Sequence, residues 1–236
     1  MFPTVTEKKV LLDFRAASMI VMMVVLTNGF TYALFNKNAA AGSIAGANPA
    51  VSEQLYLLDQ ASVFVSDVDK FEQKVRQVAN ELSVPPEWLM AVSYSESKFD
   101  ASVSNHRGSG ATGLIQWMPT TAKDFDITVE KLRNLNHAEQ LDYVYEYLDR
   151  VRRKYKQYET LTELYLAILY PRAIPEDYCY TMYAKPSEAY KLNVGLDIHK
   201  DGRVTVKDID DRMKKMYPTA YMAQRETGTV WSFLGF

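Results

Sequence analysis

The 236-residue sequence predicts an all-α protein, with one helical domain behind an apolar amino-terminal helix. Three observations predict this class. Apolar residues recur at alternating steps of three and four in several segments, which is the spacing of one helix face. Strand-like alternation is nearly absent, and residues 16–35 contain no charged side chain. The composition, 47% hydrophobic and 24% charged, is typical of a folded protein and excludes a wholly disordered one.

Charge and cysteine content narrow the class of function. The 27 basic and 29 acidic residues give a net charge of −2, so we expect no nucleic-acid partner. A basic run over residues 150–156 is interpreted as a solvated helix face, with contact to an acidic surface or polymer as the alternative. The single cysteine, Cys179, excludes an internal disulfide framework, and three scattered histidines cannot by themselves build a zinc site.

The uncharged run over residues 16–35 has about the length needed to cross the hydrocarbon of a bilayer. Basic residues precede it, so residues 1–37 are predicted to hold a transmembrane or signal-anchor helix. Two alternatives stay open. A secretory signal would be cleaved near the alanines at 39–41, and a buried or oligomerising helix would never enter a membrane.

The rest of the chain divides by composition. Residues 38–65 form a linker and lead-in whose first part is rich in Ala, Gly, Ser and Asn. Residues 66–185 form the helical domain, and residues 186–236 form a carboxyl-terminal extension.

The first helix of the domain is expected from residue 66, with Ser66 and Asp69 as a variant capping box. The run Val84-Pro85-Pro86-Glu87 ends this helix and begins the next, because proline is tolerated in a first helical turn. That second helix continues to Glu96 without a breaker.

Three glycines make residues 105–113 a loop, after which a short helix is expected over residues 114–125. Asn136 and Glu139 form a second capping signature, before a long helix. Further helices are expected over residues 160–170 and over residues 213–217.

Glu96 is the candidate catalytic residue. It ends an apolar helix and precedes small polar residues and a glycine loop, which would let an extended ligand approach the backbone. Apolar surroundings would raise the pKa of this carboxyl group and keep it protonated. Cleavage of a glycosidic bond requires such an acid. On this evidence alone, a glutamate exposed to solvent at a helix end is the more common interpretation.

Two short motifs add to this interpretation. Glu96-Ser97-Lys98-Phe99-Asp100, followed by Gly113-Leu114-Ile115-Gln116-Trp117-Met118-Pro119, resembles the paired motif of the soluble lytic transglycosylase and goose-type lysozyme superfamily. The helix before Glu96 also resembles the one that carries the acid in that superfamily. The resemblance covers about forty residues.

The resemblance implies a lysozyme-like helical domain that cleaves the β-1,4 bond between N-acetylmuramic acid and N-acetylglucosamine in bacterial peptidoglycan. It implies that Glu96 acts as acid and then base, and that the substrate's own acetamido group replaces a second carboxylate. No cofactor is needed for this chemistry. The implied substrate-binding residues are Ser97, Gly113, Gln116, Met118 and Tyr170.

The third motif of the superfamily departs from its usual form. An Ala-Tyr-Asn-Ala-Gly segment is replaced here by residues 166–173, in which Tyr170 is the stand-in for the tyrosine. This form is more similar to transglycosylase domains of bacteriophage virion proteins. Asp100 and Asp124 are interpreted as surface acids, and Tyr165 and Tyr180 as core residues or as part of the cleft.

The segment from Asp197 to Asp208 resembles the twelve-residue calcium loop of EF-hand and dockerin modules, with Gly202 at its turn. It therefore predicts a structural Ca²⁺ site. A hydrogen-bonded turn without metal is the alternative, since His199 suits calcium poorly and Asp208 is shorter than the usual glutamate. The predicted ligands are Asp197, His199, Asp201, Arg203, Thr205 and Asp208.

Together these observations predict a peptidoglycan-cleaving enzyme that faces the periplasm or cell wall from a membrane anchor, or that belongs to a virion. Such an enzyme would open the wall locally for phage genome entry or for an envelope-spanning machine, with virion or envelope proteins as partners. A secreted form after signal cleavage is the alternative location. The alternative functions are a non-catalytic glycan-binding or structural protein of the same fold, and a calcium-responsive membrane protein.

Overall fold

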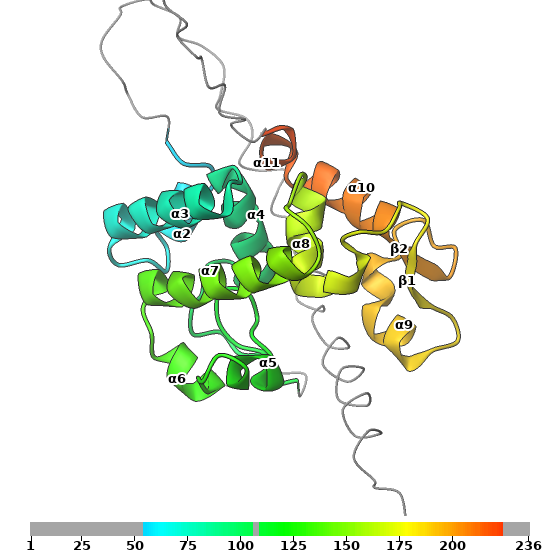
Figure 1. Cartoon of the computed structure of the whole chain (residues 1–236), viewed down its shortest axis with the longest axis horizontal. Coiled ribbons are helices and arrows are strands. Elements are labelled where there is room, and N and C mark those ends of the chain that lie inside the picture. The colour runs from blue at the N-terminus through cyan, green and yellow to red at the C-terminus, as the bar shows by residue number, and fades with distance from the viewer. Residues whose placement is uncertain (1–53, 106–108, 224–236) are drawn as a thin grey trace, which may run out of the picture.

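The computed structural model describes residues 54–105 and 109–223. Helices dominate this part of the chain, as predicted, around one core in which α4 lies between α3 and α8 (Figure 1). The predicted membrane helix lies outside the described residues. Among the residues that are described, no helix is long and apolar enough to span a bilayer.

The two helices that lead to Glu96 form as the sequence predicts. After the short α2 (Leu58–Ala61), α3 spans Val68–Leu82 and α4 spans Pro86–Ser97. Proline stands in the first turn of α4, where no intrahelical N–H partner is needed. The predicted cap of α3 is wrong by one residue, because the Asp67 side chain accepts the hydrogen bond from the Lys70 N–H.

Two further helices complete the core. The capping box of Asn136 and Glu139 is confirmed at the start of α7 (His137–Lys154), which packs along α3. Thr160 caps α8 (Leu161–Leu169), a helix that is buried along almost all its length. A single 3-10 turn, η1 (Pro171–Ala173), follows α8.

The short helix predicted over residues 114–125 begins later than expected. Residues 113–116 form a turn, Trp117 makes an isolated bridge to Thr112, and α5 spans only Pro119–Lys123, followed by α6 (Val129–Arg133). Gln116 adopts the left-handed backbone conformation, at φ 54°, which a right-handed helix cannot contain. The apolar spacing of this segment therefore reflects burial in a loop.

The carboxyl-terminal part contains more structure than predicted. A two-stranded antiparallel sheet pairs β1 (Thr181–Ala184) with β2 (Arg203–Thr205), so the pairing joins both sides of the boundary expected near residue 185. The helix expected over residues 213–217 is longer, because the Thr205 capping box starts α10 (Val206–Met216). The remaining elements are α9 (Glu188–Asn193), η2 (Val194–Leu196) and α11 (Pro218–Met222).

Candidate active site

Glu96 lies in the last turn of α4 and only 5% of its surface is exposed. Burial raises its pKa from 4.5 to about 8. A hydrogen bond from Tyr165 and the positive charges of Arg212 and Lys98 lower the pKa, but burial prevails. The Glu96 carboxyl group therefore carries its proton at neutral pH, as an acid catalyst must.

The residues that face Glu96 come from three parts of the chain. Tyr165 comes from the middle of α8, Lys98 from the end of α4, and Arg212 from α10. The sequence offered Tyr165 only as an aromatic residue of uncertain place, and gave no signal for Arg212. Contacts between segments this far apart depend on the tertiary fold, which local spacing does not reveal.

Three of the predicted substrate-binding residues organise the loop that follows α4. The Ser97 hydroxyl bonds to the carbonyl oxygens of Ser93 and Leu114, both at 3.1 Å, and so ties the helix to the loop. Gly113 has φ +80°, which favours glycine. The Gln116 side chain donates to the Gly113 carbonyl at 3.1 Å, which fixes its direction inside the loop.

Sequence reasoning missed Gln140, which holds this loop in place. Its side chain is fully buried on α7, accepts the Leu114 N–H at 3.0 Å and donates to the carbonyl oxygens of Ala101 and Leu132. A Cβ atom at Gly113 would lie 2.6 Å from the Gln140 Oε1 atom. The glycine is therefore needed both for its backbone conformation and for the space it leaves.

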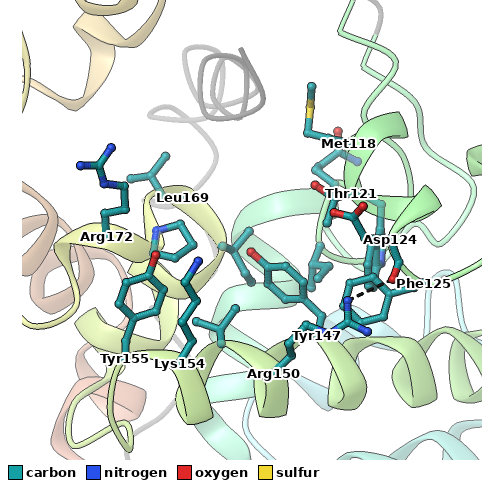
Figure 2. A pocket seen from close by; sticks show the side chains of 16 residues that line it. Met118, Thr121, Asp124, Phe125, Tyr147, Arg150, Lys154, Tyr155, Leu169 and Arg172 are labelled. Carbon is teal, nitrogen blue, oxygen red and sulfur yellow. Dashed lines mark hydrogen bonds between the residues drawn. The ribbon is translucent and has the colours of Figure 1, made fainter. Parts of the chain in front are cut away.

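A pocket of about 230 Å³ opens between α5, α7 and the end of α8. Gln116 and Met118 line it, but Glu96, Ser97, Gly113 and Tyr170 do not. Figure 2 shows Tyr147 at its centre, with Arg150 and Phe125 on one side and Lys154 on the other. The Arg150 guanidinium lies 3.9 Å from the centre of the Phe125 ring. Part of the basic run over residues 150–156 thus lines this pocket.

Two other members of that basic run form ion pairs within α7. The Arg152 and Arg153 guanidinium groups both contact the Asp149 carboxylate, at 2.7 and 2.5 Å. The run therefore has two faces, one on the pocket and one in ion pairs along α7.

Tyr170 lies apart from the pocket. It caps the end of α8, and its ring packs against those of Tyr180 and Tyr183, with centroid separations of 6.5 and 5.6 Å. Of the two aspartates interpreted as surface acids, Asp100 accepts hydrogen bonds from Ser102 within a turn, and Asp124 lines the pocket.

The predicted calcium loop is closed by hydrogen bonds between its own residues. Asp197 accepts the N–H groups of Asp201 and Gly202, while the Asp201 carboxylate pairs with Arg203 at 3.2 Å. Asp208 lies in the first turn of α10 and completes the capping box of Thr205, and its carboxylate accepts from Thr205 and from His199, whose Nδ1 lies 2.7 Å from Oδ1. These side chains bond to one another and do not converge on a common point.

Across the described residues, no group of three or more His, Cys, Asp or Glu side chains is arranged to hold a metal ion. Calcium binding at this loop stays a prediction. A melting temperature raised by added Ca²⁺ and lowered by EDTA would establish it, and an unchanged one would establish the hydrogen-bonded turn.

Comparison with known proteins adds one match. Residues 73–169 match the family model of the transglycosylase SLT domain, which is less than half of the 236 residues. The search of curated proteins returned no match. The matched segment begins in α3, ends with α8 and includes Glu96, Gln116 and all of the pocket's lining residues except Pro171 and Arg172. The helical, lysozyme-like part of this chain is therefore similar to a family of peptidoglycan lytic transglycosylases.

Proposed function

We propose that the protein is a lytic transglycosylase that cleaves the β-1,4 bond between N-acetylmuramic acid and N-acetylglucosamine, with Glu96 as its acid and base. The observation that carries the proposal is the burial of Glu96 at the end of α4, which raises its pKa to about 8. A solvated glutamate would be ionised at neutral pH and could not donate a proton. The match to the transglycosylase SLT domain supports the substrate class.

The chemistry follows from the protonation of Glu96. The Glu96 carboxyl group gives its proton to the glycosidic oxygen while the bond from that oxygen to the anomeric carbon breaks. The acetamido group of the sugar stabilises the positive charge on the anomeric carbon. The Glu96 carboxylate then takes the proton of the sugar's C6 hydroxyl as its oxygen attacks that carbon, which gives a 1,6-anhydro product and restores the acid.

The pocket between α5, α7 and α8 is the proposed place of a neighbouring sugar or of its peptide. Gln116 and Met118 lie on its wall, and aromatic side chains such as Tyr147 offer apolar surface to a sugar face. Arg150, Lys154 and Arg172 add positive charge, which suits the carboxylates of the peptides that peptidoglycan carries.

We further propose that residues 16–35 tether this domain to a membrane, or that the protein is part of a virion, so that cleavage opens the wall locally. An anchor and a linker would hold the domain near its polymeric substrate while it searches the mesh. Extraction of the full chain from membranes only with detergent would support the tether, and release by salt alone would contradict it.

The function is tested by digesting purified peptidoglycan with the full chain and with its Glu96→Gln variant, and reading the released sugars by mass spectrometry. Glu87→Gln, which changes a second glutamate of α4, is the matched control. Anhydromuropeptides released by the wild type and by Glu87→Gln, but not by Glu96→Gln, are expected. Reducing-end products lost in the same way would mean hydrolysis. No release by the wild type would favour a non-catalytic glycan-binding protein.

A further inference from the structure

The helices α10 and α11 lie outside the segment that matches the family, yet α11 packs on α4 and α10 packs on α8. The Thr162 hydroxyl of α8 donates to the Asp210 carboxylate of α10 at 2.8 Å, in a buried contact. The Trp88 indole N–H of α4 donates to the carbonyl oxygen of Ala220, in α11, at 2.9 Å. These bonds fix α10 and α11 over the two helices that carry Glu96 and Tyr165 (Figure 1).

Arg212 projects from α10 into this interface. It is only 8% exposed, and its Nε and Nη2 atoms have no hydrogen-bond partner among the described residues. No carboxylate of the described residues lies within ion-pair distance of it. A buried guanidinium with unused N–H groups is costly, so its retention needs a compensating role.

The groups around Arg212 identify that role. Its positive charge lowers the pKa of four groups near it. They are Glu96 in α4, Lys98 just after α4, Tyr165 in α8 and Tyr217 just after α10. The Ser95 hydroxyl and the Tyr217 hydroxyl are also buried without a hydrogen bond of good geometry. Among these neighbours, Glu96 is the one that can become an anion in the reaction.

We propose that Arg212 is a positioning residue of the active site, whose unused N–H groups bind the Glu96 carboxylate once the acid has given up its proton. This inference rests on the proposed function of Glu96. While Glu96 is protonated it is neutral, and Arg212 has no anion to pair with. When the proton moves to the glycosidic oxygen, a buried carboxylate appears near a buried cation with free donors, and a shift of the Arg212 side chain then brings the two into contact.

This pairing assists the first half of the cycle and orients the carboxylate for the second half. It stabilises the carboxylate formed when the glycosidic bond breaks, which makes Glu96 a stronger acid. The same carboxylate, once held by the guanidinium, faces the incoming hydroxyl group and recovers its proton from it. The helix that supplies Arg212 is therefore part of the catalytic centre, although it lies beyond residues 73–169.

The test uses the full chain with three variants. Arg212→Met removes the charge, Arg212→Lys keeps it, and Lys215→Met removes an exposed charge from the same helix as a control. Cleavage of peptidoglycan is measured from pH 5 to pH 10, with circular dichroism to confirm that each variant folds. Titration of the Glu96 side chain is followed in parallel by carbon-13 NMR, with Glu96→Gln to assign the signal.

For Arg212→Met we expect the alkaline limb of the pH profile to move upward by about one pH unit, and the rate at neutral pH to fall about tenfold. Arg212→Lys should keep the wild-type limb, and Lys215→Met should change neither. A folded Arg212→Met variant with an unmoved limb would overturn the inference, as would an Arg212→Lys variant that behaves like Arg212→Met.

The two proposals fail in different ways. If the wild type releases no product, the proposed function is wrong, and the NMR titration still decides the pairing. A Glu96 signal that titrates at the same pH in wild type and Arg212→Met then overturns the role of Arg212. If the wild type cleaves and the folded Arg212→Met variant has the same pH profile as the wild type, the proposed function stands and the inference about Arg212 is wrong.

Discussion

At the scale of single residues, the burial of Glu96 suits its proposed role as an acid and also costs stability. Folding buries its carboxyl group beside Tyr165 and raises its pKa from 4.5 to about 8. Between these two values the unfolded chain releases the proton and the folded protein keeps it. The free energy of unfolding therefore falls as pH rises through this range, and falls no further above about pH 8.

Glu96→Gln should therefore stabilise the protein, because an amide cannot ionise. Near pH 4 wild type and variant should unfold with similar free energies. Toward pH 8 the variant should become more stable than the wild type, by an amount on the order of a few kcal/mol. Urea unfolding at several pH values measures this difference. A difference that stays constant with pH would mean that Glu96 is not buried in its protonated form.

The residue scale also sets the limit of prediction from sequence. The motif around Glu96 and Gln116 singled out the acid and the loop after it, since these features are local. The sequence did not indicate the roles of Arg212, Gln140 and Tyr165, because each of these side chains acts on a residue far away in the sequence. Tyr170 is the stand-in for the tyrosine of the altered third motif, and in the structure its ring packs against those of Tyr180 and Tyr183.

At the scale of elements, the loop after α4 depends on one side chain of α7. Gln140 satisfies the Leu114 N–H and two carbonyl groups, all in the interior. Gln140→Met would keep the volume and leave the Leu114 N–H and the Ala101 carbonyl without partners, while the Leu132 carbonyl keeps the Leu135 N–H at 3.0 Å. We expect it to lower the free energy of unfolding by about 2–4 kcal/mol.

Activity should fall in the same variant, because this loop carries Gln116. Gln73→Met, at an exposed position of α3, is the matched control. Denaturant unfolding and peptidoglycan digestion measure the two effects. A Gln140→Met variant as stable as Gln73→Met would show that water can replace the glutamine.

Helices with explicit end signals were predicted well, and a buried loop was not. The capping box at Asn136 and the proline at the start of α4 act within a few residues, so the sequence alone reveals them. The segment 114–118 is apolar at helical spacing, but a left-handed residue and hydrogen bonds to α7 make it part of a loop. The sheet of β1 and β2 was missed because its strands have only four and three residues.

At the scale of the whole molecule, the carboxyl-terminal helices α10 and α11 pack against α8 and α4 of the core. The bond between the Trp88 indole and the Ala220 carbonyl joins positions 132 residues apart. Trp88→Phe should lower the free energy of unfolding by about 1–3 kcal/mol, since it removes the indole's bond to that carbonyl, which then keeps only the Ala223 N–H at 3.2 Å, and removes apolar volume.

Limited proteolysis is the measurement for this variant. We expect faster cleavage near α11 in Trp88→Phe than in Tyr178→Phe, a change at an exposed position. Equal rates of cleavage would mean that α11 stays on α4 without this bond, and that apolar packing alone holds it.

The most direct test of Glu96 as the acid measures product release from peptidoglycan across pH 5 to pH 10, for the full chain and for Glu96→Gln. This role predicts cleavage at neutral pH that declines above about pH 8, where Glu96 loses its proton. It also predicts a cleavage rate at least a hundredfold lower in the folded variant. Cleavage by Glu96→Gln at the wild-type rate, or a wild-type rate that rises through pH 8, would contradict it.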